Sequence, residues 1–193
     1  MKNKKLKVKD LVTIGIFAVI YFALMFGVGM MGLMPILFLV YPTVLGLVSG
    51  VVIMLFMVKV PKPWALFILG MIAPLVMFVM GHTYVLPLHA LVVMLLAELI
   101  RRSGGYHSFK ADALAFSVFN TWICGSLMQM LLAKETYLDM CAMMGQDYVN
   151  QLERLITYPH MGIVYLGAFL GALVGAWLGR AMLKKHFIKA GIA

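Results

Sequence analysis

The sequence predicts an all-α membrane bundle of six transmembrane helices with both termini in the cytoplasm. Three observations lead to this prediction. Of the 193 residues, 64% are hydrophobic and 12% are charged, whereas a soluble domain is about 45–50% apolar. The apolar residues form long runs, and Lys and Arg lie between these runs. Because no polar linker divides the chain, we expect a single membrane domain over residues 1–193.

Six apolar stretches approach the length of about 20 residues that a helix needs to cross the hydrocarbon core. The third and fourth are short, and the break at Gly81-His82-Thr83-Tyr84 predicts a tight hairpin between them. We therefore expect spans at about 11–30, 35–58, 64–80, 85–100, 112–132 and 161–183.

The positions of Lys and Arg predict the orientation of these spans, because cytoplasmic loops are enriched in both residues. If six spans alternate, all but two of the 16 bases fall on the side of the termini, and the exceptions are Lys134 and Arg154. Five or seven spans would scatter them. The net charge of +9 does not indicate nucleic-acid binding, because the bases flank apolar runs and form no single basic face.

A long outer loop is expected at residues 133–160, which hold Glu135, Asp139, Asp147 and Glu153. Its Tyr, Met and Leu residues suggest a short amphipathic helix over the bundle. This loop is either a lid or a plain solvated connection, and the sequence favours neither.

Small residues at four-residue spacing predict close helix packing in the membrane. The sixth span carries a ridge of four glycines, and the second span carries Gly46 and Gly50. The first span has a looser ladder of Gly15, Val19, Ala23 and Gly27. Packing within the chain is the simpler interpretation, and packing against a second membrane subunit is the alternative. The ridge of the sixth span comprises Gly167, Gly171, Gly175 and Gly179.

Polar residues near the outer ends of the spans are candidates for a binding pocket, because exposing them to lipid is costly. His82, Thr83, Tyr84 and His89 surround the expected hairpin. Anchoring at the membrane interface is the alternative role of these His and Tyr residues.

The fifth span carries two further polar candidates, Asn120 and Gln129. Asn120 either bonds to a neighbouring helix or lines a cavity. Met30, Met34 and His160 would lie at the same outer mouth, where flexible thioethers suit an adaptable apolar surface.

Several segments resemble one family of bacterial membrane proteins. They are residues 6–17 (LKVKDLVTIGIF), Pro35 after a Gly/Met-rich turn, the Gly81-His82 hairpin and residues 102–110 (RSGGYHSFK). Their order resembles that of the Trep_Strep family, which is similar to the substrate-binding S components of energy-coupling factor (ECF) transporters.

The resemblance implies a six-helix subunit that captures a vitamin, a metal or another micronutrient outside the cell. It also implies partners, namely a membrane T component and two cytoplasmic ATPases. S components dock through small residues of the first helix, commonly Ala-x-x-x-Ala. Gly15 and Val19 take the matching spacing here, Val19 departs from the pattern, and Ala23 extends it. The sequence has no Walker A motif, so ATP hydrolysis would belong to the partners.

Outer His, Met and Tyr residues in an apolar pocket would suit a flat metal-bearing ligand such as haem, and the family resemblance adds a link to haem acquisition. His82 or His89 would then be the axial ligand. A vitamin or vitamin precursor is the competing substrate. A bare transition metal is disfavoured, because no tight His, Cys and carboxylate cluster occurs in the sequence.

Other functional classes find less support. The spans contain no HExxH, no GxSxG and no pair of Asp residues, so we expect no enzyme activity in this chain. A stand-alone carrier or channel would commonly show internal repeats or a mid-membrane acid, and neither is evident. A purely structural or assembly role also stays open. Purification would separate these classes, because an S component should associate with a T subunit and two ATPases.

Overall fold

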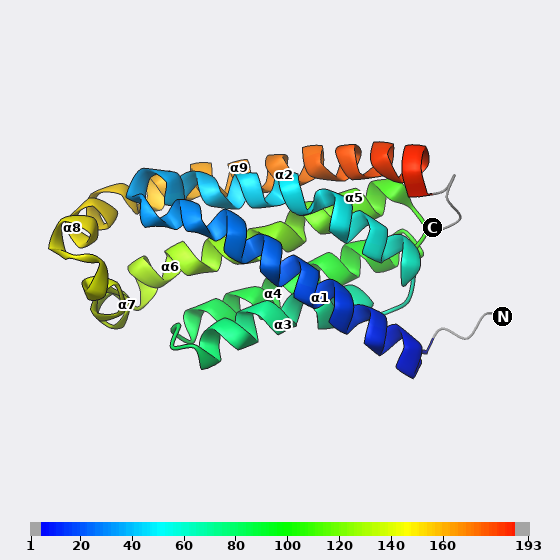
Figure 1. Cartoon of the computed structure of the whole chain (residues 1–193), viewed down its shortest axis with the longest axis horizontal. Coiled ribbons are helices and arrows are strands. Elements are labelled where there is room, and N and C mark those ends of the chain that lie inside the picture. Colours follow the sequence, from blue (N-terminus) through cyan, green and yellow to red (C-terminus); the bar gives the residue numbers. More distant parts are fainter. Residues whose placement is uncertain (1–4, 188–193) are drawn as a thin grey trace.

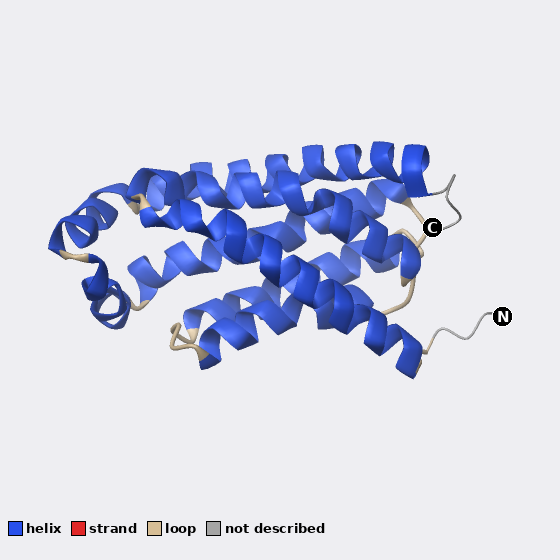
Figure 2. Ribbon diagram, in the orientation of Figure 1, coloured by secondary structure: helices blue, strands red, loops and turns tan. Residues whose placement is uncertain are grey.

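Helices form nearly all of the computed structural model, which describes residues 5–187 (Figure 2). No strand occurs in this part of the chain, so the all-α prediction is confirmed. The helices run back and forth along the long axis (Figure 1). The long ones are α1 (Val8–Gly29), α2 (Pro35–Lys59), α3 (Ala65–Val79), α4 (Val85–Ser103), α5 (Phe109–Asn120) and α9 (Tyr158–Met182). α5 continues through the 3-10 turn η2 (Thr121–Ile123) into α6 (Cys124–Leu132). The short ones are η1 (Met30–Leu33), α7 (Lys134–Cys141), η3 (Ala142–Met144), α8 (Gln146–Leu155) and η4 (Leu183–Phe187).

Four helical segments within the described residues are long and apolar enough to cross a membrane. They are Val8–Leu33, Pro35–Lys59, Phe109–Leu132 and Tyr158–Lys185. The remaining two of the six expected spans correspond to α3 and α4. The apolar α3 has only 15 residues. The last turns of α4 carry Glu98, Arg101 and Arg102, so that helix is less apolar at one end.

The helix boundaries differ from the sequence prediction where side chains cap the helix ends. α1 begins at Val8 rather than near residue 11, because the Asp10 carboxylate accepts a hydrogen bond of 2.7 Å from the Lys7 amide. α9 begins at Tyr158 rather than 161, with the Thr157 hydroxyl facing the His160 amide at 3.5 Å. The expected fifth span is interrupted by the 3-10 turn η2, and the outer loop contains α7 and α8 rather than one helix.

The two ends of the bundle differ in charge. At the basic end, α1 begins, α9 ends, and the 60–64 and 104–108 connections join α2 to α3 and α4 to α5 (Figure 1). Every described Lys and Arg except Lys134 and Arg154 lies at this end. The opposite end, here the cap end, carries α7, η3 and α8. Lys2, Lys4 and Lys189 lie outside the described residues.

Glycines bring α2 and α9 into backbone contact, and the two helices lie side by side in Figure 1. A Cβ at Gly179 would come within 2.7 Å of the Gly50 carbonyl oxygen, and one at Gly46 within 2.6 Å of the Ala172 nitrogen. A Cβ at Gly50 would meet the backbone of Gly175. The glycine ridge of the sixth span therefore packs within the chain.

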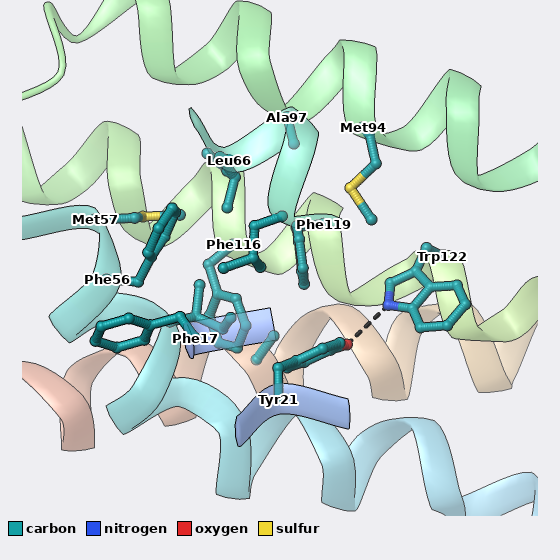
Figure 3. Packing of buried hydrophobic residues seen from close by; sticks show 14 of the residues in the cluster. Phe17, Tyr21, Phe56, Met57, Leu66, Met94, Ala97, Phe116, Phe119 and Trp122 are labelled. Carbon is teal, nitrogen blue, oxygen red and sulfur yellow. Dashed lines mark hydrogen bonds between the residues drawn. The ribbon is translucent and has the colours of Figure 1, made fainter. Parts of the chain in front are cut away.

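Aromatic residues fill the centre of the bundle. Tyr21 and Trp122 are fully enclosed, and the Trp122 Nε1–H donates a hydrogen bond of 2.8 Å to the Tyr21 hydroxyl (Figure 3). The Phe119 ring meets the Tyr21 ring edge-on at 5.6 Å. This hydrogen bond gives each of two buried polar groups a partner and ties α1 to η2.

The small-residue ladder of α1 has no partner within the described chain. Gly15, Val19, Ala23 and Gly27 are all exposed. A Cβ added at Gly15 or Gly27 would have no heavy atom within 4 Å. The two kinds of glycine ridge thus differ, because the ridge of α9 is filled by α2 and the ladder of α1 faces outward.

The contact between α2 and α9 makes a direct prediction about stability. Gly50→Leu should destabilise the fold by more than the roughly 1–3 kcal/mol of ordinary overpacking, because its side chain would meet backbone that cannot rotate away. Thermal unfolding in detergent, followed by size exclusion, measures this. Gly27→Leu is the matched control and should leave the midpoint nearly unchanged. Equal midpoints for both variants would contradict the predicted contact.

Candidate functional site

A cavity of about 390 Å³ lies at the cap end. Its walls come from the ends of α1 and α3, from η1 and from the start of α2. The cap helices α7 and α8 and the 3-10 turn η3 line it on the other side, and the cavity is partly open. This volume falls within the range of about 300–1,000 Å³ usual for small-molecule sites. The sequence analysis placed its candidate pocket at this end of the helices.

The cap is held in place by both polar and apolar contacts. Tyr148 of α8 donates a hydrogen bond of 2.5 Å to the Gly32 carbonyl in η1. Lys134 and Glu153 join the start of α7 to α8 at 2.8 Å. Gly145 turns the chain between η3 and α8 with a φ of 94°, which favours glycine. The expected outer loop is therefore a packed structure over the cavity.

The cavity lining is apolar, sulfur-rich and aromatic. No Asp, Glu, Lys or Arg lines it among the described residues. Such a surface adapts to the shape of an uncharged ligand, because thioethers are flexible and polarisable. Its Met and aromatic members are Met25, Met30, Met77, Met80, Met140, Met144, Phe26, Phe38, Tyr41, Tyr137 and Tyr148.

His82 is the imidazole of this cavity, and α6 holds it in place. The Gln129 Oε1 atom accepts hydrogen bonds from the Thr83 amide at 2.7 Å and the Thr83 hydroxyl at 3.0 Å. The Gln129 Nε2 atom donates to the Ser126 carbonyl at 3.0 Å and lies 3.2 Å from His82 Nδ1. The sequence singled out His82, Thr83 and Gln129 separately, and the structure joins them in one network.

This network determines which His82 nitrogen carries the proton. A backbone amide only donates, so the atom facing Thr83 N must be the Gln129 oxygen. The Gln129 NH₂ group therefore faces His82 Nδ1, which must accept. Burial lowers the pKa of His82 below its ordinary value of 6.5, so the ring is neutral at pH 7. The neutral ring then carries its proton on Nε2 and offers the cavity an N–H donor.

His89 lies outside the cavity lining and connects three segments. Its Nδ1 lies 3.2 Å from the Trp122 carbonyl, and its Nε2 lies 2.6 Å from the Tyr165 hydroxyl. A carbonyl only accepts, so Nδ1 donates and Nε2 accepts from Tyr165. Both nitrogens are occupied, and iron coordination by His89 would require one of these bonds to break.

Asn120 bridges two helices. Its Nδ2 donates to the Pro42 carbonyl of α2 at 2.9 Å and to the Ala168 carbonyl of α9 at 3.0 Å. These are the helix-to-helix bonds that the sequence offered as one of two interpretations, and Asn120 does not line the cavity.

The other predicted site residues are divided between the cavity and the surface. Met30 lines the cavity. Tyr84, Met34 and His160 are exposed and do not line it. The His160 ring stays local, with Nδ1 2.6 Å from the Leu155 carbonyl. Sequence reasoning missed Tyr41, Tyr137 and Tyr148, and the aromatic content of the outer loop was the available signal for the last two.

Comparison with known proteins adds one decisive match. A family model described as hypothetical bacterial integral membrane protein (Trep_Strep) matches residues 8–189. The chain belongs to the Trep_Strep family. This Trep_Strep protein is accordingly a bacterial integral membrane protein, and its apolar helices are consistent with that location. No curated protein and no solved structure matched the chain.

Within residues 5–187 of this Trep_Strep protein, no three His, Cys, Asp or Glu side chains converge on a point that would hold a metal ion. The two cysteines there, Cys124 and Cys141, are both free and buried. Cys141 lines the cavity from the cap, whereas Cys124 lies in α6. The site therefore offers hydrogen bonding, aromatic surface and thioethers.

The bond between Tyr148 and Gly32 predicts how firmly the cap closes. Tyr148→Phe removes a hydrogen bond of about 1 kcal/mol and should raise the alkylation rate of Cys141 about fivefold, because the cap opens more often. Mass spectrometry of maleimide-treated protein measures the rate. Tyr158→Phe, at an exposed Tyr of the same end, should not change it. An unchanged rate in Tyr148→Phe would mean that other contacts hold the cap closed.

Proposed function

We propose that the chain is the substrate-binding S component of an ECF-type importer and captures a small, largely apolar organic micronutrient in the cap-end cavity. The observation that carries this proposal is the uncharged cavity of about 390 Å³ that the bundle lines together with α7, η3 and α8. A vitamin or vitamin precursor is the substrate class that suits it. The chain itself then performs no catalysis, and ATP is hydrolysed by partner subunits.

The proposed topology has six spans, with the basic end in the cytoplasm. The positive-inside rule supports this orientation, because the described bases other than Lys134 and Arg154 lie at that end. α3 and α4 then cross as a short hairpin beside the four longer spans. The cap and its cavity face outward, where a nutrient would arrive.

Cysteine labelling tests this orientation. In the Tyr148→Phe variant, an impermeant maleimide should reach Cys141 from outside intact cells. Labelling only in inverted vesicles would overturn the orientation.

Hydrogen bonding in the cavity favours an organic ligand over haem. An axial ligand must present a free lone pair to iron. The neutral His82 presents an N–H group instead, and its Nδ1 faces Gln129. Haem binding through His82 would therefore require this side chain to leave Gln129. A ligand with a carbonyl or similar acceptor needs no such change.

The α7–η3–α8 cap would act as a lid. Segments that border a binding site commonly move to close over the ligand after it has entered. The bond from Tyr148 to Gly32 holds the cap against η1, and buried apolar residues such as Val149 and Leu152 pack in one cluster with the bundle helices. Opening the cap leaves the α2–α9 contact and the aromatic centre of the bundle intact.

The outward ladder of α1 supports docking to a T component. Close helix approach in lipid requires small residues, and Gly15 and Ala23 are exposed on α1, where no helix of residues 5–187 covers them. Val19, which is 71% exposed, would make the interface less smooth than an Ala there. The T component and two ATPases are the partners we propose for this face.

The ligand itself is the first test. Native mass spectrometry of the full chain purified from bacterial membranes should show one bound small organic molecule. His82→Ala should weaken its binding by up to about tenfold, the effect of losing one hydrogen bond. His160→Ala is the control, because this His does not line the cavity. A ligand bound equally well by both variants would place the binding site elsewhere.

The same sample discriminates haem. A Soret band that appears on titration with haem and disappears in His82→Ala would replace the organic ligand with haem. The pH dependence of binding further distinguishes haem from an organic ligand. Iron competes with a proton for the imidazole lone pair, so haem affinity would fall as the pH drops through the lowered pKa of His82. An Nε2–H donor is present in both protonation states and would keep its bond.

Docking is tested by a pair of matched glycines. Gly15 and Gly162 both have no heavy atom within 4 Å of an added Cβ, so neither Leu variant should disturb the fold. Gly15→Leu should abolish co-purification of the T component and ATPases, whereas Gly162→Leu on α9 should not. Ligand binding should persist in both variants. Loss of partners in both, or in neither, would contradict docking through α1.

A further inference from the structure

A second, larger cavity of about 800 Å³ lies at the basic end. It is formed by the connection from α2 to α3, the last turns of α4 and the connection from α4 to α5. The bundle separates it from the cap-end cavity, and the proposed capture of a micronutrient makes no use of it.

Two strained residues of this cavity are held by one carboxylate. Trp64 and Tyr106 are the non-glycine residues with positive φ in the described chain, at 67° and 65°. The Trp64 amide donates to Glu98 Oε1 at 2.7 Å, and the Tyr106 hydroxyl donates to the same atom at 3.0 Å. Such conformations persist only where their surroundings enforce them, and they concentrate at functional sites.

The second oxygen of this carboxylate has no partner. Glu98 is 3% exposed and lines the cavity, and its Oε2 makes no hydrogen bond within residues 5–187. The neighbouring Arg101 is engaged elsewhere, with its Nε 3.0 Å from Asp112 Oδ1 and its Nη2 2.7 Å from the Met57 carbonyl. A buried carboxylate oxygen without a donor is destabilising. The cavity therefore suits a ligand that brings an N–H or O–H group.

Two other buried polar atoms also lack partners in the described chain, Arg101 Nη1 and Asn120 Oδ1. Neither Arg101 nor Asn120 lines the basic-end cavity or the cap-end cavity. Glu98 differs from both because it combines an unsatisfied oxygen with a space large enough for a ligand.

The rest of the lining is basic on one side and apolar on the other. Arg102 and His107 are exposed at the mouth, and Lys62 lies there with its Nζ 2.6 Å from Asp10 Oδ2. Leu95 and Leu99 form an exposed apolar strip along α4. Phosphate attracts the first group and an acyl chain suits the second.

Trp64 also favours a lipid as the ligand of this cavity. Its ring is half exposed, stands at right angles to the Phe67 ring at 5.6 Å, and lines the same cavity. Tryptophan is enriched at the level of lipid headgroups.

Tyr106 stays protonated at neutral pH. Burial, and after it the Glu98 carboxylate, raise the pKa of Tyr106 to about 12, so its phenol remains the donor to Glu98 Oε1.

We propose that this cavity binds a phospholipid whose headgroup carries a hydrogen-bond donor, such as phosphatidylethanolamine or phosphatidylglycerol. The donor reaches Glu98 Oε2, the phosphate lies at Arg102, and an acyl chain follows Leu95 and Leu99. Phosphatidylcholine has the same phosphate and chains but no N–H or O–H in its headgroup, so it leaves Oε2 unsatisfied. The site does not depend on whether the chain is a transporter.

The test uses the delipidated full chain in detergent and native mass spectrometry. Phosphatidylethanolamine, phosphatidylglycerol and phosphatidylcholine with identical acyl chains are titrated separately. The two donor lipids should bind about tenfold more tightly than phosphatidylcholine, which corresponds to one hydrogen bond to a charged group. Equal binding of all three would overturn the proposal.

Variants assign the contacts. Glu98→Gln keeps an oxygen for Trp64 and Tyr106 but replaces the free oxygen with an NH₂ group, so it should erase the preference for donor lipids. Arg102→Gln should weaken all three lipids alike, and Lys110→Gln, an exposed base at the same end outside the cavity, should weaken none. A persistent preference in Glu98→Gln, or no effect of Arg102→Gln, would contradict the assignment.

Two further measurements keep the test decisive. If Glu98→Gln lowers the thermal midpoint, Leu99→Gln replaces it, because this side chain is exposed and lines the cavity, so the change should weaken lipid binding without unfolding the protein. Glycerophosphoethanolamine, the headgroup without its chains, should bind far more weakly than the lipid. Equal binding of the free headgroup would make this a site for a soluble phosphate compound and would overturn the lipid proposal.

Discussion

The backbone contact between α2 and α9 is the constraint on which the rest of the bundle depends. Hydrophobic attraction does not hold helices together in lipid, so close packing and interhelical hydrogen bonds must do so. Glycines at 46, 50, 175 and 179 let the two backbones meet with no side chain between them. That approach brings the Pro42 and Ala168 carbonyls near enough for a single Asn120 amide to bond to both. α5 is thereby attached to the α2–α9 pair.

Polar side chains inside this bundle act mainly as connections between helices. Asn120 joins α5 to α2 and α9, His89 joins α4 to η2 and α9, and Gln129 joins α6 to the α3–α4 turn. An unsatisfied polar group is costly where no water can reach, which favours hydrogen bonds such as these, although Asn120 Oδ1 has no partner within residues 5–187. Their hydrogen bonds also fix the imidazole tautomers, which decides what His82 can offer to a ligand.

Sequence reasoning predicted what depends on local composition and missed what depends on tertiary contact. The apolar runs marked the long helices, and four-residue glycine spacing marked the α9 ridge. Residues three apart are neighbours on a helix, so the spacing of Glu98 and Arg101 by itself would favour a local ion pair between them. In the fold, Arg101 instead pairs with Asp112, and Glu98 holds Trp64 and Tyr106. Only the packing of α4 against α5 and the two connections brings those partners within reach.

Similarly, His82 and His89 looked equivalent in the sequence, since both lie near the expected outer mouth. The η2 turn and the approach of Gly125 to the His89 ring place His89 in the helix interface, whereas the hairpin turn leaves His82 at the cavity. A 3-10 turn inside a long apolar run leaves no clear signal in hydrophobic periodicity, so the sequence alone did not separate the two. The Tyr residues of the cap were missed for a related reason, because their partners lie on other elements. Tyr148 bonds to Gly32 of η1, and Tyr137 packs in one apolar cluster with Leu127 and Met130 of α6.

The α3–α4 hairpin contributes residues to both cavities. At the cap end its turn is held by Gln129 through Thr83, and at the basic end the start of α3 is held by Glu98 through the Trp64 amide. Between these ends, Gly70 packs so closely on Met94 that a Cβ there would overlap the thioether, and it would come within 2.7 Å of Phe119. Interdigitated helices of this kind resist sliding past each other. The hairpin therefore presents His82 to one cavity and Trp64 and Glu98 to the other as parts of a single packed unit.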